Sequence, residues 1–168
     1  NLMRKPQIKL EEIHRNAGEI AHFGEHLRKG KSPQSFKTQE KVELKRRISD
    51  EYLVHADQVI CAYNKTRVQI NARIRACLGY KGIINIGERV ICLRNNKKDG
   101  LFNGMQGEVI DLYEGEYGKK YMTLDYGGYE PINVWYDPNQ FGKEKSDFDH
   151  GKDTPNPFDY AYCITCHK

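Results

Sequence analysis

Two short polar segments of the chain carry residues that could hold a phosphate or a prosthetic group. The six C-terminal residues read Cys163-Ile-Thr-Cys-His-Lys168. Taken alone, Cys-x-x-Cys-His is the attachment motif of c-type haem. The second segment, Asn64-Lys-Thr-Arg67, follows an apolar run at residues 58–63 and opens a helical pattern. Amide, hydroxyl and cationic side chains at the start of a helix suit a phosphate group, because the first backbone N–H groups point at it.

The residues around Cys163 favour a strand over a haem or metal site. Residues 160–165 are aromatic, apolar and β-prone, and they follow the breaker-rich Thr154-Pro-Asn-Pro157. Side chains alternate faces along a strand, so Cys163 and Cys166 would point to opposite sides. The two thiols could then not grip one haem or one zinc ion without a break in the strand. We therefore predict a buried strand running into a polar turn and no metal site, with a haem or zinc protein as an alternative.

The elements before residue 80 have an α/β pattern. Asn16 with Glu19 three residues later predicts a helix that ends at residues 28–30. Residues 31–57 are polar and predict irregular structure, with one strand near residues 42–48. Residues 58–63 predict a buried strand. A second helix follows, which we expect to be capped by Asn64, stopped by Gly79 and apolar on the face made by Ile70, Ile74, Cys77 and Leu78.

The pattern changes to β between residues 86 and 136. Short β-prone runs at residues 88–95, 107–113, 120–126 and 132–136 alternate with turn dipeptides such as Asp99-Gly100 and Asn103-Gly104. This spacing predicts a small β-barrel. Residues 137–157 are polar and predict a return linker. We expect the final strand to lie beside residues 58–63, which makes the barrel an insertion and brings His167 and Asn64 to one rim.

Bulk properties set mild limits on function. The 168 residues have a formal net charge of +4 and a pI near 8.7, a balance that is compatible with a polyanionic partner without requiring one. An odd number of cysteines, five, fits buried thiols in a reducing compartment better than a disulfide framework. No apolar run approaches the length of a membrane span.

Four stretches, taken in order, resemble one enzyme family. Leu10-Glu-Glu-Ile-His-Arg15 is similar to motif IV of superfamily 1 helicases, and residues 59–75 are similar to the strand and helix of motif IVa. Residues 87–96 and 101–109 look like the barrel inserted in the second RecA-like domain of the RecD/Dda branch. Residues 158–168 resemble the start of motif V, which in the family continues into Ser-Gln-Gly.

The resemblance implies a fold and a domain organisation. The fold is α/β: a partial RecA-like parallel sheet with helices, plus an inserted small all-β barrel of the Src-homology type. Residues 1–82 would be the first part of the second motor domain, residues 83–140 the barrel, and residues 141–168 the return linker and the motif V strand. The chain would be the C-terminal motor-domain fragment of an ATP-dependent DNA helicase that moves 5′ to 3′.

The resemblance also implies roles for particular residues. Arg15 would be the catalytic residue, because the motif IV arginine reaches the terminal phosphates of ATP in the family. The DNA-binding residues would be Asn64, Lys65, Thr66, Arg67, Thr165, His167 and Lys168. Candidate DNA contacts in the barrel are Arg94, Lys97, Lys98 and Phe102, since cations beside aromatic rings suit single strands.

The implied ligands are shared with residues outside this sequence. The intact enzyme would bind ATP and Mg²⁺, single-stranded DNA and its own N-terminal RecA-like domain, without a membrane partner, in a bacterial cytoplasm or as a phage protein in a bacterial host. No Gly-x-x-x-x-Gly-Lys-Ser/Thr loop occurs in the 168 residues. We therefore predict that this fragment binds no cofactor tightly and does not hydrolyse ATP alone. The alternative function is a non-motor nucleic-acid-binding module built on the β-barrel.

Overall fold

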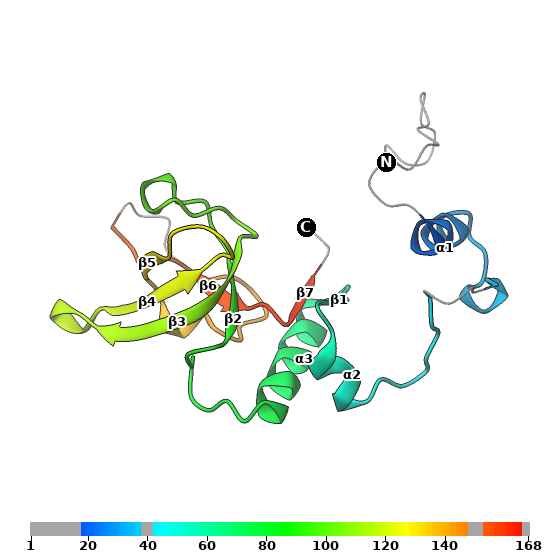
Figure 1. Ribbon diagram of the computed structural model, residues 1–168, viewed down its shortest axis with the longest axis horizontal. Helices are drawn as coiled ribbons and strands as arrows, with labels where there is room; N and C mark the ends of the chain where they lie inside the picture. The colour runs from blue at the N-terminus through cyan, green and yellow to red at the C-terminus, as the bar shows by residue number, and fades with distance from the viewer. Residues whose placement is uncertain (1–17, 38–41, 148–152, 166–168) are drawn as a thin grey trace. The chain divides into compact units, whose positions relative to one another are not determined.

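A computed structural model describes residues 18–37, 42–147 and 153–165 of the chain (Figure 1). The chain divides into two units, residues 1–48 and residues 49–168. Arg15 and Asn16, predicted to contact ATP and to cap the first helix, lie outside the described residues, as do Cys166, His167 and Lys168.

The first unit contains the predicted helix. Helix α1 spans Glu19–Arg28, and Gly30 follows it with φ 73°, so the predicted C-terminal end is confirmed. A short 3₁₀ helix, η1 (Pro33–Ser35), comes next. The rings of Phe23 and Phe36 pack edge to face with centroids 5.0 Å apart, which holds the two elements together. Residues 42–48 form no strand, so that prediction is wrong.

The second unit begins with a helix that the sequence pattern did not reveal. Helix α2 spans Asp50–His55 in a segment that we expected to be irregular. Ser49 is its N-cap: the Ser49 hydroxyl oxygen accepts a hydrogen bond from the Tyr52 N–H at 3.5 Å. Asp50 and Glu51 add negative charge to the first turn, where it favours a helix. The helix is short, so it leaves little periodicity in the sequence, and Leu53 is its buried residue.

The predicted association of the chain's last strand with residues 58–63 is confirmed. Strand β1 (Val59–Cys61) pairs in parallel with β7 (Cys163–Thr165), with Val59 opposite Cys163 and Cys61 opposite Thr165 (Figure 1). Helix α3 (Asn64–Cys77) follows β1 and is stopped by Gly79, two residues beyond its end, whose φ of 78° suits glycine. The Tyr80 N–H donates to the Arg75 carbonyl at 3.0 Å, which closes the helix end.

The inner face of α3 is more polar than predicted. Ile74 is buried as expected, but the other buried residues of the helix are Arg67 and Asn71, whereas Cys77 and Leu78 are exposed. The physical reason is that this face packs against main-chain groups of the segment carrying Asp159 and Cys163, which need hydrogen-bond partners.

The β-rich region forms a five-stranded antiparallel sheet in the order β5-β4-β3-β2-β6. Its strands are β2 (Arg89–Cys92), β3 (Gln106–Glu114), β4 (Lys120–Asp125), β5 (Ile132–Trp135) and β6 (Phe158–Tyr160). The four strands predicted between residues 86 and 136 are confirmed. Short 3₁₀ helices η2 (Lys97–Asp99), η3 (Glu116–Gly118) and η4 (Pro138–Gln140) lie in the connections. One apolar core fills the sheet: Val90, Cys92, Leu101, Val109, Met122, Leu124, Val134, Tyr136 and Phe158.

The mixed α/β class is confirmed, but strand pairing among the described residues does not close the expected barrel. The two edge strands, β5 and β6, are joined beside their ends by one isolated bridge, between Tyr136 and Asn156. The side chain of Asn156 lies at this contact between β5 and β6. Its Nδ2 donates to the Trp135 carbonyl at 3.2 Å and to Asp99 at 2.8 Å. Main-chain bonds also cross here, from the Asn156 N–H to the Trp135 carbonyl at 2.8 Å and from the Asp137 N–H to the Asn156 carbonyl at 3.1 Å. The two edges therefore meet at one short contact and not along a continuous ladder.

The predicted strand at residues 160–165 is two strands. Strand β6 ends at Tyr160 and pairs with β2, and β7 begins at Cys163 and pairs with β1. Only Ala161 and Tyr162 separate them, so two residues connect the antiparallel sheet to the parallel pair. In the described ranges, no helix has the length and hydropathy needed to cross a bilayer.

Candidate nucleic-acid interface

The carboxyl ends of β1 and β7 meet in one polar rim, which we define as Asn64, Lys65, Thr66 and Thr165. The Thr165 hydroxyl donates to the Asn64 side-chain oxygen at 3.2 Å, although the two residues are 101 positions apart. Asn64 and Lys65 are exposed, and Thr66 and Thr165 are half-buried. Parallel pairing is the cause, because it places the carboxyl ends of both strands at the same edge.

The start of α3 leaves backbone donors at this rim. The first intrahelical hydrogen bond runs from the Arg67 N–H to the Tyr63 carbonyl at 3.0 Å, so the N–H groups of the preceding residues have no acceptor within the helix. Asn64 was predicted to cap the helix, but this is wrong: Tyr63 is the N-cap residue and no side chain caps the helix. Asn64 instead accepts the bond from Thr165, which couples the helix start to β7.

Arg67 points into the protein rather than into the rim. It forms an ion pair with Asp159, and its Nη2 donates to the Lys143 carbonyl at 2.6 Å. Asp159 is 1% exposed, and its carboxylate also accepts the Gly142 N–H at 2.9 Å. A buried charge requires such pairing and hydrogen bonding. Arg67 therefore anchors the first turn of α3, and its cation is already neutralised by Asp159.

Asn71 fixes the position of β7, a role that the sequence did not reveal. Its side-chain oxygen accepts the Cys163 N–H at 2.7 Å, and its Nδ2 donates to the carbonyls of Cys163 and Tyr160 at 3.0 and 3.2 Å. The amide thus satisfies main-chain groups on both sides of the break between the two sheets. The sequence offered one indication of this role, because Asn71 is a polar residue on the predicted inner face of the helix.

An exposed aromatic side chain borders the rim. Tyr63 immediately precedes Asn64 and is 75% exposed. A tyrosine at a helix N-cap with so much of its ring in solvent offers a stacking face for a base. The sequence pattern predicts Tyr63 as the last residue of a buried strand, and for this side chain the prediction is wrong.

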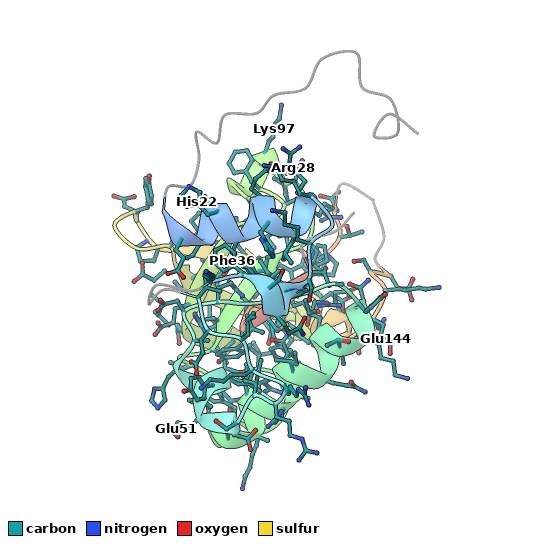
Figure 2. All side chains as sticks on the ribbon, turned by 90° about the vertical axis from the view of Figure 1, so that its right-hand side faces the viewer. His22, Arg28, Phe36, Glu51, Lys97 and Glu144 are labelled. Carbon is teal, nitrogen blue, oxygen red and sulfur yellow. The ribbon has the colours of Figure 1, made fainter. Side chains whose placement is uncertain are left out.

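The candidate residues in the β-rich region lie on a different element, the loop formed by residues 95–103. Lys97 and Lys98 are exposed, and Figure 2 shows the Lys97 side chain extending away from the ribbon of its own segment. Phe102 is 57% exposed. Arg94, which precedes the loop, is half-buried and its Nη1 donates to the Thr154 hydroxyl at 3.0 Å. The loop is therefore a second exposed group of two cations and one ring.

Two thiols lie directly behind the rim. The sulfurs of Cys61 and Cys163 are 3.5 Å apart, and the Cys61 thiol donates to the Tyr63 carbonyl at 3.4 Å. Cys163 is fully buried, so its sulfur is not available to form a haem thioether. Burial, followed by the hydrogen bond to Cys61, raises the pKa of the Cys163 thiol to about 12.

Comparisons with known proteins give only a distant likeness. No protein-family model and no curated protein match the chain. Among solved structures, the chain is similar to unliganded Pif1 from Bacteroides sp, with 18% identity and a TM-score of 0.44 over 69% of this chain and 32% of that one. Pif1 helicase from Bacteroides in complex with ADP-AlF3 and ssDNA gives 20% identity and a TM-score of 0.43, over 72% and 33%.

A structure of two coordinating Pif1 helicases at forked dsDNA gives 21% identity and a TM-score of 0.46, over 73% of this chain and 31% of that one. The chain thus spans about a third of the length of these structures. Likeness at this level does not establish a family, so the function of the chain rests on its own residues.

Proposed function

We propose that the chain is the second motor domain, with its insertion, of an ATP-dependent 5′–3′ DNA helicase of superfamily 1, and that the rim holds single-stranded DNA. The observation that carries the proposal is the parallel pairing of β1 with β7, which brings two separate helicase-like sequence motifs to one edge. The 3.2 Å hydrogen bond between Thr165 and Asn64 joins these motifs directly.

Each part of the rim supplies a different contact to a single strand. The exposed Lys65 ammonium and the N–H groups at the start of α3 attract and bind a backbone phosphate. The Asn64 amide and the Thr165 hydroxyl hydrogen-bond to phosphate or sugar oxygens. Tyr63 stacks on a base. His167 and Lys168, which follow β7 in the sequence, remain predicted DNA contacts.

The parallel pair also supports a partial motor domain. Ile60, at the centre of β1, is 61% exposed. Parallel strands are normally covered on both faces, so an exposed isoleucine on such a strand indicates that a further layer belongs there. We propose that residues 1–82 and 141–168 are the parts of a RecA-like domain to which this pair belongs, with residues 83–140 inserted between them.

ATP and Mg²⁺ would bind between this domain and the N-terminal RecA-like domain of the intact enzyme. Arg15 would contact the terminal phosphates, since its rigid, permanently charged fork suits phosphate oxygens. Closure of the two domains around ATP would move the rim and its DNA by one step, because the nucleotide contacts differ between the open and closed states.

The proposal predicts how ssDNA affinity responds to changes in the rim. Lys65→Ala is expected to weaken binding of a fluorescent oligo-dT and to reduce the slope of log affinity against log salt by about 1, as for one phosphate contact. Thr165→Val, which keeps the side-chain shape, is expected to weaken binding without changing that slope. Fluorescence anisotropy over a range of salt concentrations measures both quantities.

A matched control separates the rim from general charge effects. Lys81→Ala removes one exposed cation beyond the far end of α3 and is expected to leave affinity nearly unchanged. The alternative function, a non-motor binding module, rests on the exposed Lys97, Lys98 and Phe102 of the 95–103 loop. If substitutions in the loop abolish binding while the rim variants bind like the wild type, the module is the correct reading and the motor proposal fails.

The proposal also predicts that this chain has no ATPase activity of its own. The sequence contains no phosphate-cradling loop with its lysine, which the N-terminal domain would supply. Release of inorganic phosphate from ATP, measured with and without oligo-dT, should stay at the level of a buffer control. Robust turnover by the purified chain would contradict the proposed division of the ATP site between two domains.

A further inference from the structure

The thiols of Cys61 and Cys163 form a contact across the parallel pair. Their sulfurs are 3.5 Å apart, while a disulfide bond requires about 2.05 Å. Cys163 is fully buried against α3, whereas Cys61 is half-buried and can be reached from solvent. One accessible thiol in contact with one protected thiol is the arrangement in which a first oxidation at the surface can be resolved inside the protein.

The pair lies where a change in strand position would alter the rim. Cys61 is the last residue of β1 and lies opposite Thr165, the residue that donates to Asn64. Cys163 lies opposite Val59, so the two cysteines are offset by two residues along the parallel strands. A bond between them would have to draw β1 along β7.

We propose that Cys61 and Cys163 are a reversible oxidation site whose disulfide form weakens the grip of the rim on single-stranded DNA. The oxidant is hydrogen peroxide. The Cys61 thiolate attacks the peroxide, which breaks the O–O bond and gives the Cys61 sulfenic acid and hydroxide. The Cys163 sulfur then attacks the Cys61 sulfur, which releases water and forms the S–S bond. A small dithiol reverses the reaction by thiol–disulfide exchange.

The buried position of Cys163 shapes the order of these steps. Its raised pKa leaves little thiolate at neutral pH, so it does not react first with a dissolved oxidant. In the second step, the contact with Cys61 compensates for the low fraction of thiolate at Cys163, because a group held beside its target reacts as if at very high concentration. Attraction to the nearby Arg67 guanidinium also favours the Cys163 thiolate.

The bond would change the rim through the strand register. Shortening the sulfur–sulfur distance by about 1.5 Å between offset residues requires backbone movement, since the register opposes each cysteine to a different residue. The contact between Thr165 and Asn64 is the first to be disturbed, because it depends on the pairing of Cys61 with Thr165. This effect on DNA rests on the proposed function, but formation of the bond does not.

The experiment measures the bond and the binding separately. The full chain with Cys77 and Cys166 changed to serine, so that these two thiols cannot compete, is treated with hydrogen peroxide. We expect intact mass to fall by two hydrogens and peptide mapping to join Cys61 to Cys163. Addition of dithiothreitol should restore both thiols. Accumulation of Cys61 sulfinic acid without a cross-link would overturn the inference.

DNA binding is then compared in the reduced and oxidised protein. Oxidation should weaken affinity for oligo-dT about tenfold, which corresponds to losing about one hydrogen-bonded contact to a charged group. The Cys61→Ser variant, which cannot form the bond, should keep its affinity in peroxide. An oxidised protein that binds as tightly as the reduced one would overturn the switch. If the bond forms but the reduced protein does not bind DNA, the proposed function fails instead.

Discussion

The ion pair between Arg67 and Asp159 is the clearest case of a residue whose role depends on burial. Both side chains are almost inaccessible, and Asp159 accepts further main-chain hydrogen bonds. Asp159→Asn keeps the shape of the side chain but leaves the Arg67 cation without its counter-charge. We expect the free energy of unfolding to fall by about 3–5 kcal/mol, as when one partner of a buried pair is removed. Urea unfolding followed by circular dichroism measures it.

A second ion pair on the same helix is the control. Arg73 and Asp50 form a pair in which both side chains are about half exposed. Asp50→Asn should therefore lower the free energy of unfolding by no more than about 1 kcal/mol. Equal effects of the two substitutions would show that burial of Arg67 does not decide its contribution.

At the residue level, the sequence predicted which residues lie near the rim, but it did not predict the role of each side chain. Asn64, Lys65, Thr66 and Arg67 share a helix start, where polar and cationic residues are typical of phosphate binding. Only the three-dimensional structure reveals that Arg67 turns inward, because its partner Asp159 is 92 positions away. Local patterns cannot specify such a pairing.

Helix α3 is the element that holds both sheets, and Asn71 is its most informative position. Asn71→Ala would leave main-chain groups of Cys163 and Tyr160 without partners inside the protein. Each such group costs about 1–3 kcal/mol. We expect a marked fall in the free energy of unfolding and, because β7 carries Thr165, weaker oligo-dT binding as well.

The matched control is Gln69→Ala, an exposed amide on the same helix. It should change both stability and binding very little, since surface substitutions are usually within about 0.5 kcal/mol. Loss of stability in Asn71→Ala without any change in binding would mean that the position of β7 is not needed at the rim.

Elements with strong local signals were predictable, and elements defined by distant partners were not. Strands β2 to β5 were expected because β-prone runs alternate with turn dipeptides, and Gly100 and Gly104 do adopt positive φ values of 69° and 89°. The division of residues 160–165 into β6 and β7 was not predicted. Hydrophobic pattern continues across Ala161 and Tyr162, and the break exists because the two halves pair with different sheets.

At the scale of the whole molecule, every residue of the rim and both sheets belong to the second unit, residues 49–168. We therefore expect a chain consisting of residues 49–168 to unfold cooperatively in urea and to bind oligo-dT with the affinity of the full chain. Non-cooperative unfolding, or a large loss of binding, would indicate that residues 1–48 are needed to form the rim.

The mixed α/β architecture followed from the sequence because the strand–helix pattern before residue 80 and the strand–turn pattern after residue 86 differ plainly. The closed barrel did not form as expected because closure depends on pairing between the edge strands. Between β5 and β6 that pairing is one isolated bridge at Tyr136 and Asn156, supplemented by bonds from the Asn156 side chain to Asp99 and to the Trp135 carbonyl. Such a polar network has no periodic signature.

Two buried ion pairs between α3 and the antiparallel sheet define what a transplanted insertion would have to keep. Arg67 pairs with Asp159 of β6, and Arg75 pairs with Glu88, a fully buried residue that immediately precedes β2. Exchanging that sheet for one from another protein would leave the guanidinium groups of Arg67 and Arg75 in the interior without a carboxylate partner. A successful chimaera must therefore carry an acidic side chain at both of its junctions.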